Sequence, residues 1–295
     1  MDVQISSDPK IARIYQDIPP ESLRQLQEFR ERHPYQSVNL NRVEWHYIDT
    51  RRGDTALFLP AGGTSIAEVS FKSIEHFAQH YRVISPDYPP IEDLEELFDG
   101  FSRLLDHLGV NKFYTMGGSY GGWIVQSLVR RFPERVSKMV ITVVGPPDPQ
   151  NSQQLAKLMP WLSIAPMFIL RSMIKRAFAG LESNKEHDPD LALIWALVQE
   201  VINFRVGKLD ILAGLDRLID QTQNYTFSPD DLLDWPGSIL ILFGSEDPAT
   251  PREKREAMRQ LYPKAEIRVF KGGEHGIALS HQKEYFAAID EFLSK

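Results

Sequence analysis

The sequence predicts an α/β fold, with a doubly wound, mostly parallel sheet and a helical cap inserted after the sixth strand. From residue 43 onward, short apolar runs rich in β-forming residues alternate with longer segments of helical periodicity, as in strands joined by helices. Residues 146–235 interrupt this alternation with helical periodicity and no convincing strand. We therefore predict a core from residues 43–145 and 236–295, a cap from residues 146–235, and a leader with one helix from residues 1–42.

Seven segments have the composition of strands. The first alternates apolar and polar residues, as an edge strand does, and the others are apolar runs typical of strands buried on both faces. These segments are residues 43–48, 56–59, 81–84, 113–116, 139–144, 239–243 and 267–270.

The clearest helical segment covers residues 91–108. Its apolar residues recur every three or four positions, which forms a stripe along one side, and Gly109 follows where a helix commonly ends. The other expected helices are residues 70–81, 121–132, 252–262, 282–293 and, in the leader, 21–32.

Composition narrows the possible functions. The chain has 295 residues, of which 42% are hydrophobic and 25% charged, enough for one large domain with an insertion or for two ordinary domains. The absence of cysteine excludes disulfides, thiolate metal sites and cysteine catalysis. A net charge of −7 without a basic stripe argues against nucleic acid as a partner. The first residues lack the features of a signal peptide, so we expect a cytoplasmic protein.

The segment Gly117-Gly118-Ser119-Tyr120-Gly121 lies between a predicted strand and a predicted helix. This is the pattern of a nucleophile elbow, a sharp turn that holds a serine above the sheet. Glycine has no Cβ, so it lets the strand and the helix approach closely on both sides of the turn. Ser119 is therefore the candidate nucleophile.

A serine nucleophile needs a base within hydrogen-bond reach and a carboxylate that orients the base. Asp247 lies just beyond the strand predicted at 239–243, and His275 lies in a glycine-rich loop just beyond the strand predicted at 267–270. We predict that Asp247 and His275 complete a catalytic triad with Ser119.

Other residues could fill these roles. Glu246 is the second choice for the acid and Asp148 a further alternative, while His281 is a weaker candidate for the base. His76 and His80 lie four residues apart, but the glutamate of an H-E-x-x-H zinc site is missing between them. We expect neither a metal nor a cofactor.

The loop at residues 59–65 follows a predicted strand and contains Gly62 and Gly63. Acyl transfer needs two backbone amides that bind the oxyanion of the tetrahedral intermediate. We assign these two donors to the amides of Gly62 and Tyr120, with Gly63 as the alternative to Gly62.

Within the predicted cap, residues 159–170 are almost wholly apolar, and Arg171, Lys175 and Arg176 follow them. The run is too short to span a membrane, which takes about 20 apolar residues. Three interpretations compete: helices packed over an active site, which we favour, an interfacial helix that contacts lipid, and a surface that binds a protein partner.

Together these motifs resemble the α/β-hydrolase superfamily over about residues 43–293. The resemblance implies the α/β-hydrolase fold and the chain order of nucleophile, acid and base that Ser119, Asp247 and His275 follow. Within the superfamily the chain looks most like maspardin and its relatives, on residues 59–65, 81–89, 98–108 and around 167–170. Pro60-Ala61 also stands where other members carry His-Gly. The resemblance to maspardin implies a protein-binding role without catalysis, whereas the complete triad implies an enzyme.

The function expected from these observations is that of a serine hydrolase, most like a carboxylesterase, which cleaves an ester or related acyl bond of a small molecule. The apolar cap, with Trp161, Phe168 and Trp195, favours a partly hydrophobic substrate. The same triad also serves C–C bond hydrolysis, perhydrolysis and cyanohydrin cleavage, and the sequence does not separate these reactions. The alternative is a maspardin-like adaptor that binds a protein partner.

Overall fold

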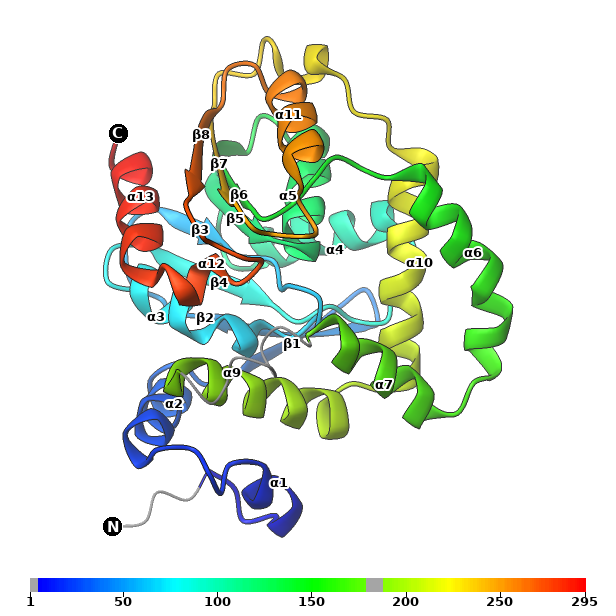
Figure 1. The fold of residues 1–295 in the computed structure, drawn as a ribbon. Helices are drawn as coiled ribbons and strands as arrows, with labels where there is room; N and C mark the ends of the chain where they lie inside the picture. Colours follow the sequence, from blue (N-terminus) through cyan, green and yellow to red (C-terminus); the bar gives the residue numbers. More distant parts are fainter. Residues whose placement is uncertain (1–4, 179–187) are drawn as a thin grey trace.

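A sheet of eight strands forms the centre of the computed structural model, which describes residues 5–178 and 188–295 (Figure 1). The strands are ordered β1-β2-β4-β3-β5-β6-β7-β8. The pairs β1/β2 and β2/β4 are antiparallel and all other pairs are parallel, which confirms the predicted mostly parallel sheet. The strands are β1 (Gln36–Leu40), β2 (Val43–Asp49), β3 (Ala56–Phe58), β4 (Arg82–Pro86), β5 (Phe113–Gly118), β6 (Val136–Thr142), β7 (Ser238–Gly244) and β8 (Glu266–Phe270).

Both faces of the inner parallel strands are buried, whereas β8, predicted to be buried on both faces, is the second edge strand, is mostly half-buried and exposes Val269. Successive strand residues point to opposite faces, so Leu57 and Val140 belong to one hydrophobic cluster while Phe58 and Ile141 belong to the other. This explains why the strands appear in the sequence as continuous apolar runs.

Helices cover both faces of the sheet (Figure 1). The first cluster includes residues of α3 (Phe71–Phe77), α12 (Ile277–Ser280) and α13 (Gln282–Ser294). The second includes residues of α4 (Leu94–His107), α5 (Tyr120–Arg131) and α11 (Arg252–Leu261). The short helix η1 (Ala67–Ser70) precedes α3. The arrangement confirms the doubly wound fold, although α4 begins three residues later than predicted, where the Asp93 side chain accepts a hydrogen bond from the Glu96 amide.

Between β6 and β7, the regular elements in the described part of the chain are helical. They are α6 (Pro149–Ile164), α7 (Met167–Ala177), α9 (Pro189–Glu200), the π-helix η2 (Val201–Arg205), α10 (Lys208–Asn224) and η3 (Pro229–Leu232). This insertion follows the sixth strand, β6, as predicted, although only five of the predicted strand segments precede it because β1 is not among them. Residues 179–187 of the predicted cap, with His187, and residues 1–4 of the predicted leader lie outside the described part.

The N-terminal segment differs from the predicted leader with one helix. The predicted helix at 21–32 is present as α2 (Pro20–Arg32), but α1 (Pro9–Ile14) and β1 are also formed. Strand β1 pairs with β2 through a two-residue turn in which Asn41 and Arg42 both have positive φ. The edge strand at this end of the sheet is therefore β1, and the predicted edge strand, β2, lies inside the sheet. Two of the five β1 residues are exposed and polar and a third is polar and half-buried, so the segment carries a weak strand pattern.

No helix among the described residues has both the length and the apolarity to cross a membrane.

Candidate active site

Ser119 occupies a one-residue turn between β5 and α5. Its backbone has φ 52° and ψ −121°, a conformation that residues with a Cβ rarely adopt. The Ser119 amide donates to the Thr142 carbonyl at the end of β6, at 3.0 Å, which fixes the turn to the sheet.

The glycines of this turn are required by close contacts. A Cβ on Gly117 would lie 2.3 Å from the Gly121 carbonyl oxygen, and a Cβ on Gly121 would lie 2.9 Å from the Pro60 carbonyl oxygen. Neither contact is compatible with a side chain unless the backbone moves. The strand, the helix and the loop that follows β3 therefore meet at Ser119.

Three side chains that the sequence predicts to act together form a chain of hydrogen bonds. The Ser119 Oγ lies 3.0 Å from Nε2 of His275. On the other side of the ring, Nδ1 lies 3.0 and 3.1 Å from the two carboxylate oxygens of Asp247. An ionised carboxylate only accepts hydrogen bonds, so Nδ1 carries the proton, and Nε2 of the neutral ring is free to accept from Ser119.

Asp247 is buried, with 2% of its surface exposed. The hydroxyl of Thr250 donates to one carboxylate oxygen at 2.7 Å, and the Ala249 amide donates to the other at 2.9 Å. Burial raises the pKa of the Asp247 carboxyl, but the hydrogen bonds from His275, Thr250 and Ala249 outweigh burial, so the pKa lies below its usual range. Asp247 is therefore ionised at neutral pH.

The alternative candidates for the acid and the base form hydrogen bonds and ion pairs with other residues. Glu246 is exposed, and its carboxylate accepts from Ser245 at 2.9 Å. Asp148 lies 3.7 Å from the ammonium of Lys254. The ring of His281 contacts the Ser280 hydroxyl at 2.9 Å and the Lys271 carbonyl at 3.2 Å.

The two amides assigned to the oxyanion lie in segments that meet at the turn. Tyr120 is the first residue of α5, and the first amides of a helix have no acceptor within the helix. Gly62 belongs to the loop whose Pro60 and Ala61 carbonyls contact the start of α5 at Gly121. The hydroxyl of Tyr88 donates to the Ala61 carbonyl at 2.7 Å and holds this loop in place.

Arg217 contacts the candidate site, although nothing in the sequence pattern distinguishes it from other arginines. Its side chain comes from α10 and is buried, with 1% of its surface exposed. Its Nε donates to the Tyr120 hydroxyl at 2.7 Å, and Nη1 donates to the carbonyls of Pro89 and Ile91. A single arginine in an amphipathic helix normally indicates a solvated face, so its burial could not be inferred from the pattern.

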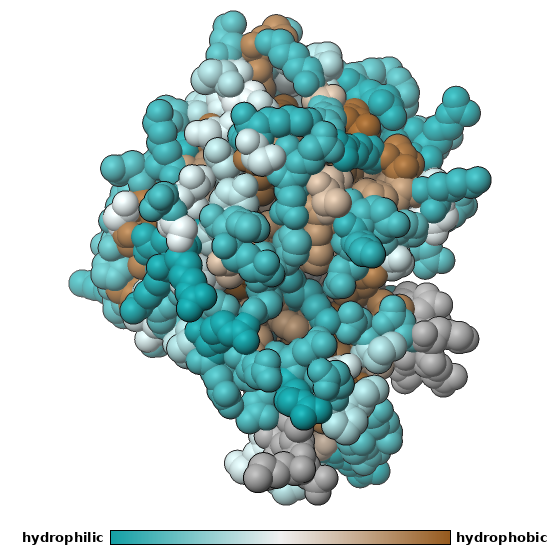
Figure 2. All heavy atoms as spheres, turned by 90° about the vertical axis from the view of Figure 1, so that its left-hand side faces the viewer, coloured by the Kyte–Doolittle hydropathy of each residue, from teal (hydrophilic) through white to brown (hydrophobic). Residues whose placement is uncertain are grey.

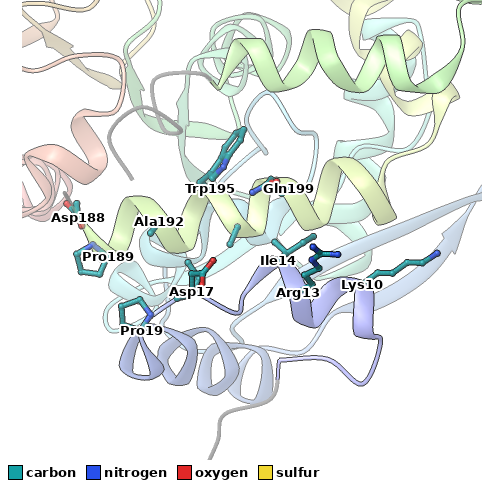
Figure 3. Close-up of a pocket in the computed structure, with 12 residues that line it drawn as sticks. Lys10, Arg13, Ile14, Asp17, Pro19, Asp188, Pro189, Ala192, Trp195 and Gln199 are labelled. Carbon is teal, nitrogen blue, oxygen red and sulfur yellow. The ribbon is translucent and has the colours of Figure 1, made fainter. Parts of the chain in front are cut away.

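The aromatic residues that favoured a hydrophobic substrate do not form one wall. Trp161 and Phe168 are each 70% exposed. Trp195 is buried and lines a different site, a groove of about 900 Å³ between α1 and α9 that also includes Lys10, Arg13 and Gln199 (Figure 3). These three residues therefore carry no information about the substrate.

Comparison with known proteins agrees with this fold. A family model described as the alpha/beta hydrolase family matches residues 56–289. The chain belongs to this family. Among its relatives is maspardin from Pongo abelii, which is 32% identical over 217 residues. The match covers 71% of this chain and 65% of maspardin, so the chain spans about two thirds of the length of that relative.

Two solved structures share the fold. A hydrolase from Pseudomonas aeruginosa PA01 is 16% identical with a TM-score of 0.72, and the match covers 89% of this chain and 99% of that one. A thermophilic esterase from Thermogutta terrifontis is 21% identical with a TM-score of 0.68, covering 88% of this chain and 98% of that one.

Proposed function

We propose that the protein is a serine hydrolase that cleaves an ester or related acyl bond of a small molecule through an acyl-enzyme. The observation that carries this proposal is the chain of hydrogen bonds from Ser119 Oγ through His275 to Asp247, at 3.0 Å for each step. A solved esterase has the same fold, which supports the same class of reaction for this protein.

In the first half of the reaction, Ser119 Oγ attacks the carbonyl carbon while His275 Nε2 takes the hydroxyl proton. Asp247 holds the ring and stabilises the imidazolium. The amides of Gly62 and Tyr120 donate to the oxyanion. His275 then gives its proton to the leaving alcohol as the bond to the carbonyl carbon breaks.

In the second half, His275 takes a proton from water, and the resulting hydroxide attacks the acyl group on Ser119. The proton returns to Ser119 Oγ as the acid leaves. Both halves use the same base, the same carboxylate and the same two amides.

The test uses a fluorophosphonate probe and short-chain p-nitrophenyl esters. We expect labelling and hydrolysis by the wild-type protein and neither by Ser119→Ala or His275→Ala. Asp247→Asn is expected to lower kcat by about 10⁴-fold. Glu246→Gln, which removes the neighbouring exposed carboxylate, is the matched control and is expected to keep wild-type kcat.

A second candidate function is that of a maspardin-like adaptor that binds a protein and has no catalytic activity. The observation that favours it is the 32% identity to maspardin over 217 residues. A folded wild-type protein that is not labelled and hydrolyses none of the esters would contradict the hydrolase proposal and support the adaptor.

A further inference from the structure

Helices α6 and α7 form a hairpin at one edge of the molecule (Figure 1). We call residues 149–177 the cap hairpin. Its inner side is apolar and packed, since Leu162 and Leu170 are buried, and α6 contacts α10. The turn between the two helices is held in place because the Lys208 ammonium on α10 donates to the Ala165 carbonyl at 2.9 Å. The cap hairpin is therefore packed against the rest of the protein in a defined position.

The outer side of the cap hairpin is apolar as well. Three large side chains around its turn, Trp161, Ile164 and Phe168, are 70%, 72% and 70% exposed. Leu158, Ile169 and Met173 extend this exposed surface along both helices. Single exposed apolar residues are ordinary, but six on one hairpin make a patch of the kind that binds a partner or a membrane. By contrast, the side that carries α13 is covered mainly by hydrophilic residues (Figure 2).

The charge of the cap hairpin indicates which of these two it binds. Its sequence contains four cations, Lys157, Arg171, Lys175 and Arg176, and neither aspartate nor glutamate, although the whole chain carries a net charge of −7. Lys157 and Arg176 are exposed and Lys175 is half-buried. Arg171 donates to the Ile202 and Asn203 carbonyls and so stabilises the packing of α7 against η2.

We propose that the cap hairpin is a peripheral membrane-binding surface for a bilayer of anionic phospholipid. Trp161, Ile164 and Phe168 enter the boundary between headgroups and acyl chains, where tryptophan is favoured. The cations beside them lie near the lipid phosphates. Stable attachment needs both an apolar and a basic contribution, and this surface supplies the two together. The proposal does not depend on whether Ser119 is catalytic.

Vesicle co-sedimentation tests the proposal with the full-length protein. We expect binding to vesicles of phosphatidylcholine with phosphatidylserine, and much weaker binding to phosphatidylcholine alone or at high salt. Trp161→Ser/Phe168→Ser and Lys175→Glu/Arg176→Glu should each lower the partition coefficient at least tenfold, roughly the effect of losing two apolar or two basic contacts. Ser119→Ala should bind as the wild type does.

Matched controls change the same chemistry elsewhere. Val269→Ser removes an exposed apolar side chain of β8, and Lys112→Glu/Lys283→Glu reverses two exposed charges. Both should keep wild-type binding. The proposal is wrong if the wild-type protein does not pellet with anionic vesicles, or if the hairpin variants pellet as the wild type does. It is equally wrong if sedimentation velocity shows that Trp161→Ser/Phe168→Ser only abolishes self-association, because the patch then joins two copies of the chain.

Discussion

At the turn around Ser119, steric contacts alone explain why the neighbouring residues are glycines. The serine sits at a positive φ, so the chain reverses within one residue and the segments on either side must pass within contact distance of each other. Glycine is the residue that permits this approach. The repeated glycines on both sides of Ser119 therefore follow from the turn, whatever chemistry the serine performs.

Replacing Gly117 with alanine tests this account. The new Cβ would lie 2.3 Å from a backbone oxygen, and we expect the free energy of unfolding to fall by about 2–3 kcal/mol, as for an overpacked core. Gly276→Ala is the control because nothing lies within 4 Å of its Cβ position, and its effect should stay within about 0.5 kcal/mol. Urea denaturation measures both, and equal losses would contradict the steric argument.

The three residues of the hydrogen-bonded chain could be predicted because each follows a strand of apolar residues. Parallel strands place their carboxyl ends at one edge of the sheet, so residues far apart in the sequence meet there. Arg217 could not be predicted in this way. Arg217 reaches the Tyr120 hydroxyl from α10. The apolar periodicity of that segment predicts a helix, but it does not predict which element the helix packs against.

At the scale of elements, α2 is tied to the rest of the protein by buried ion pairs. Arg30 lies 2.6 Å from Glu68 in η1 and 3.0 Å from Glu200 in α9. Tyr15 also donates to Glu200, at 2.6 Å. The two glutamate side chains are 3% and 8% exposed, so Arg30, together with Arg205 on Glu68, supplies positive charge to carboxylates that are largely shielded from water.

We expect Arg30→Met to lower the free energy of unfolding by about 2–3 kcal/mol, because both carboxylates lose a partner while they stay buried. This lies below the usual cost of breaking a buried pair because 27% of the Arg30 side chain is exposed. Arg24→Met on the same helix removes an exposed pair with Glu21 and should change stability by less than about 0.5 kcal/mol. Thermal unfolding that shows no difference between the two variants would contradict the assignment.

The helices and strands could be predicted where their apolar residues recur with a clear periodicity. Helix α2 was found within one residue of its ends, and the strands of the parallel core were all found. The strand β1 was missed because its five residues include only two apolar ones, and its pairing with β2 depends on tertiary contacts. The role of residues 1–42 was also missed, since ion pairs between distant segments leave no periodic pattern.

For the whole molecule, the dependence of stability on pH should show a contribution from Asp87. This carboxylate accepts from the Tyr35 hydroxyl at 2.8 Å and from the Ala67 amide at 2.7 Å, and lies 3.8 Å from Arg205. Burial raises its pKa to about 6, against the stabilising effect of these three partners. The folded protein therefore holds a proton at Asp87 at pH values where the unfolded chain has already released it.

Because the pKa is higher in the folded state, this contribution to stability is present at low pH and is lost as pH rises from about 4 to about 6. We expect a loss of about 2–3 kcal/mol over this window. Asp87→Asn cannot titrate, so its free energy of unfolding should fall less over the same range. Parallel slopes for the wild type and the variant between pH 4 and 6 would contradict the raised pKa.

The ion pair between Arg30 and Glu200 also constrains the order of events during synthesis. The two residues are 170 positions apart. At a translation rate of about 5–20 residues per second, roughly 10–35 s pass on the ribosome between the appearance of the arginine and that of its partner. Until then Arg30 has Glu68 as a partner but lacks the counter-charge that Glu200 of α9 supplies. The N-terminal segment, although made first, therefore completes its contacts only after α9 has been made.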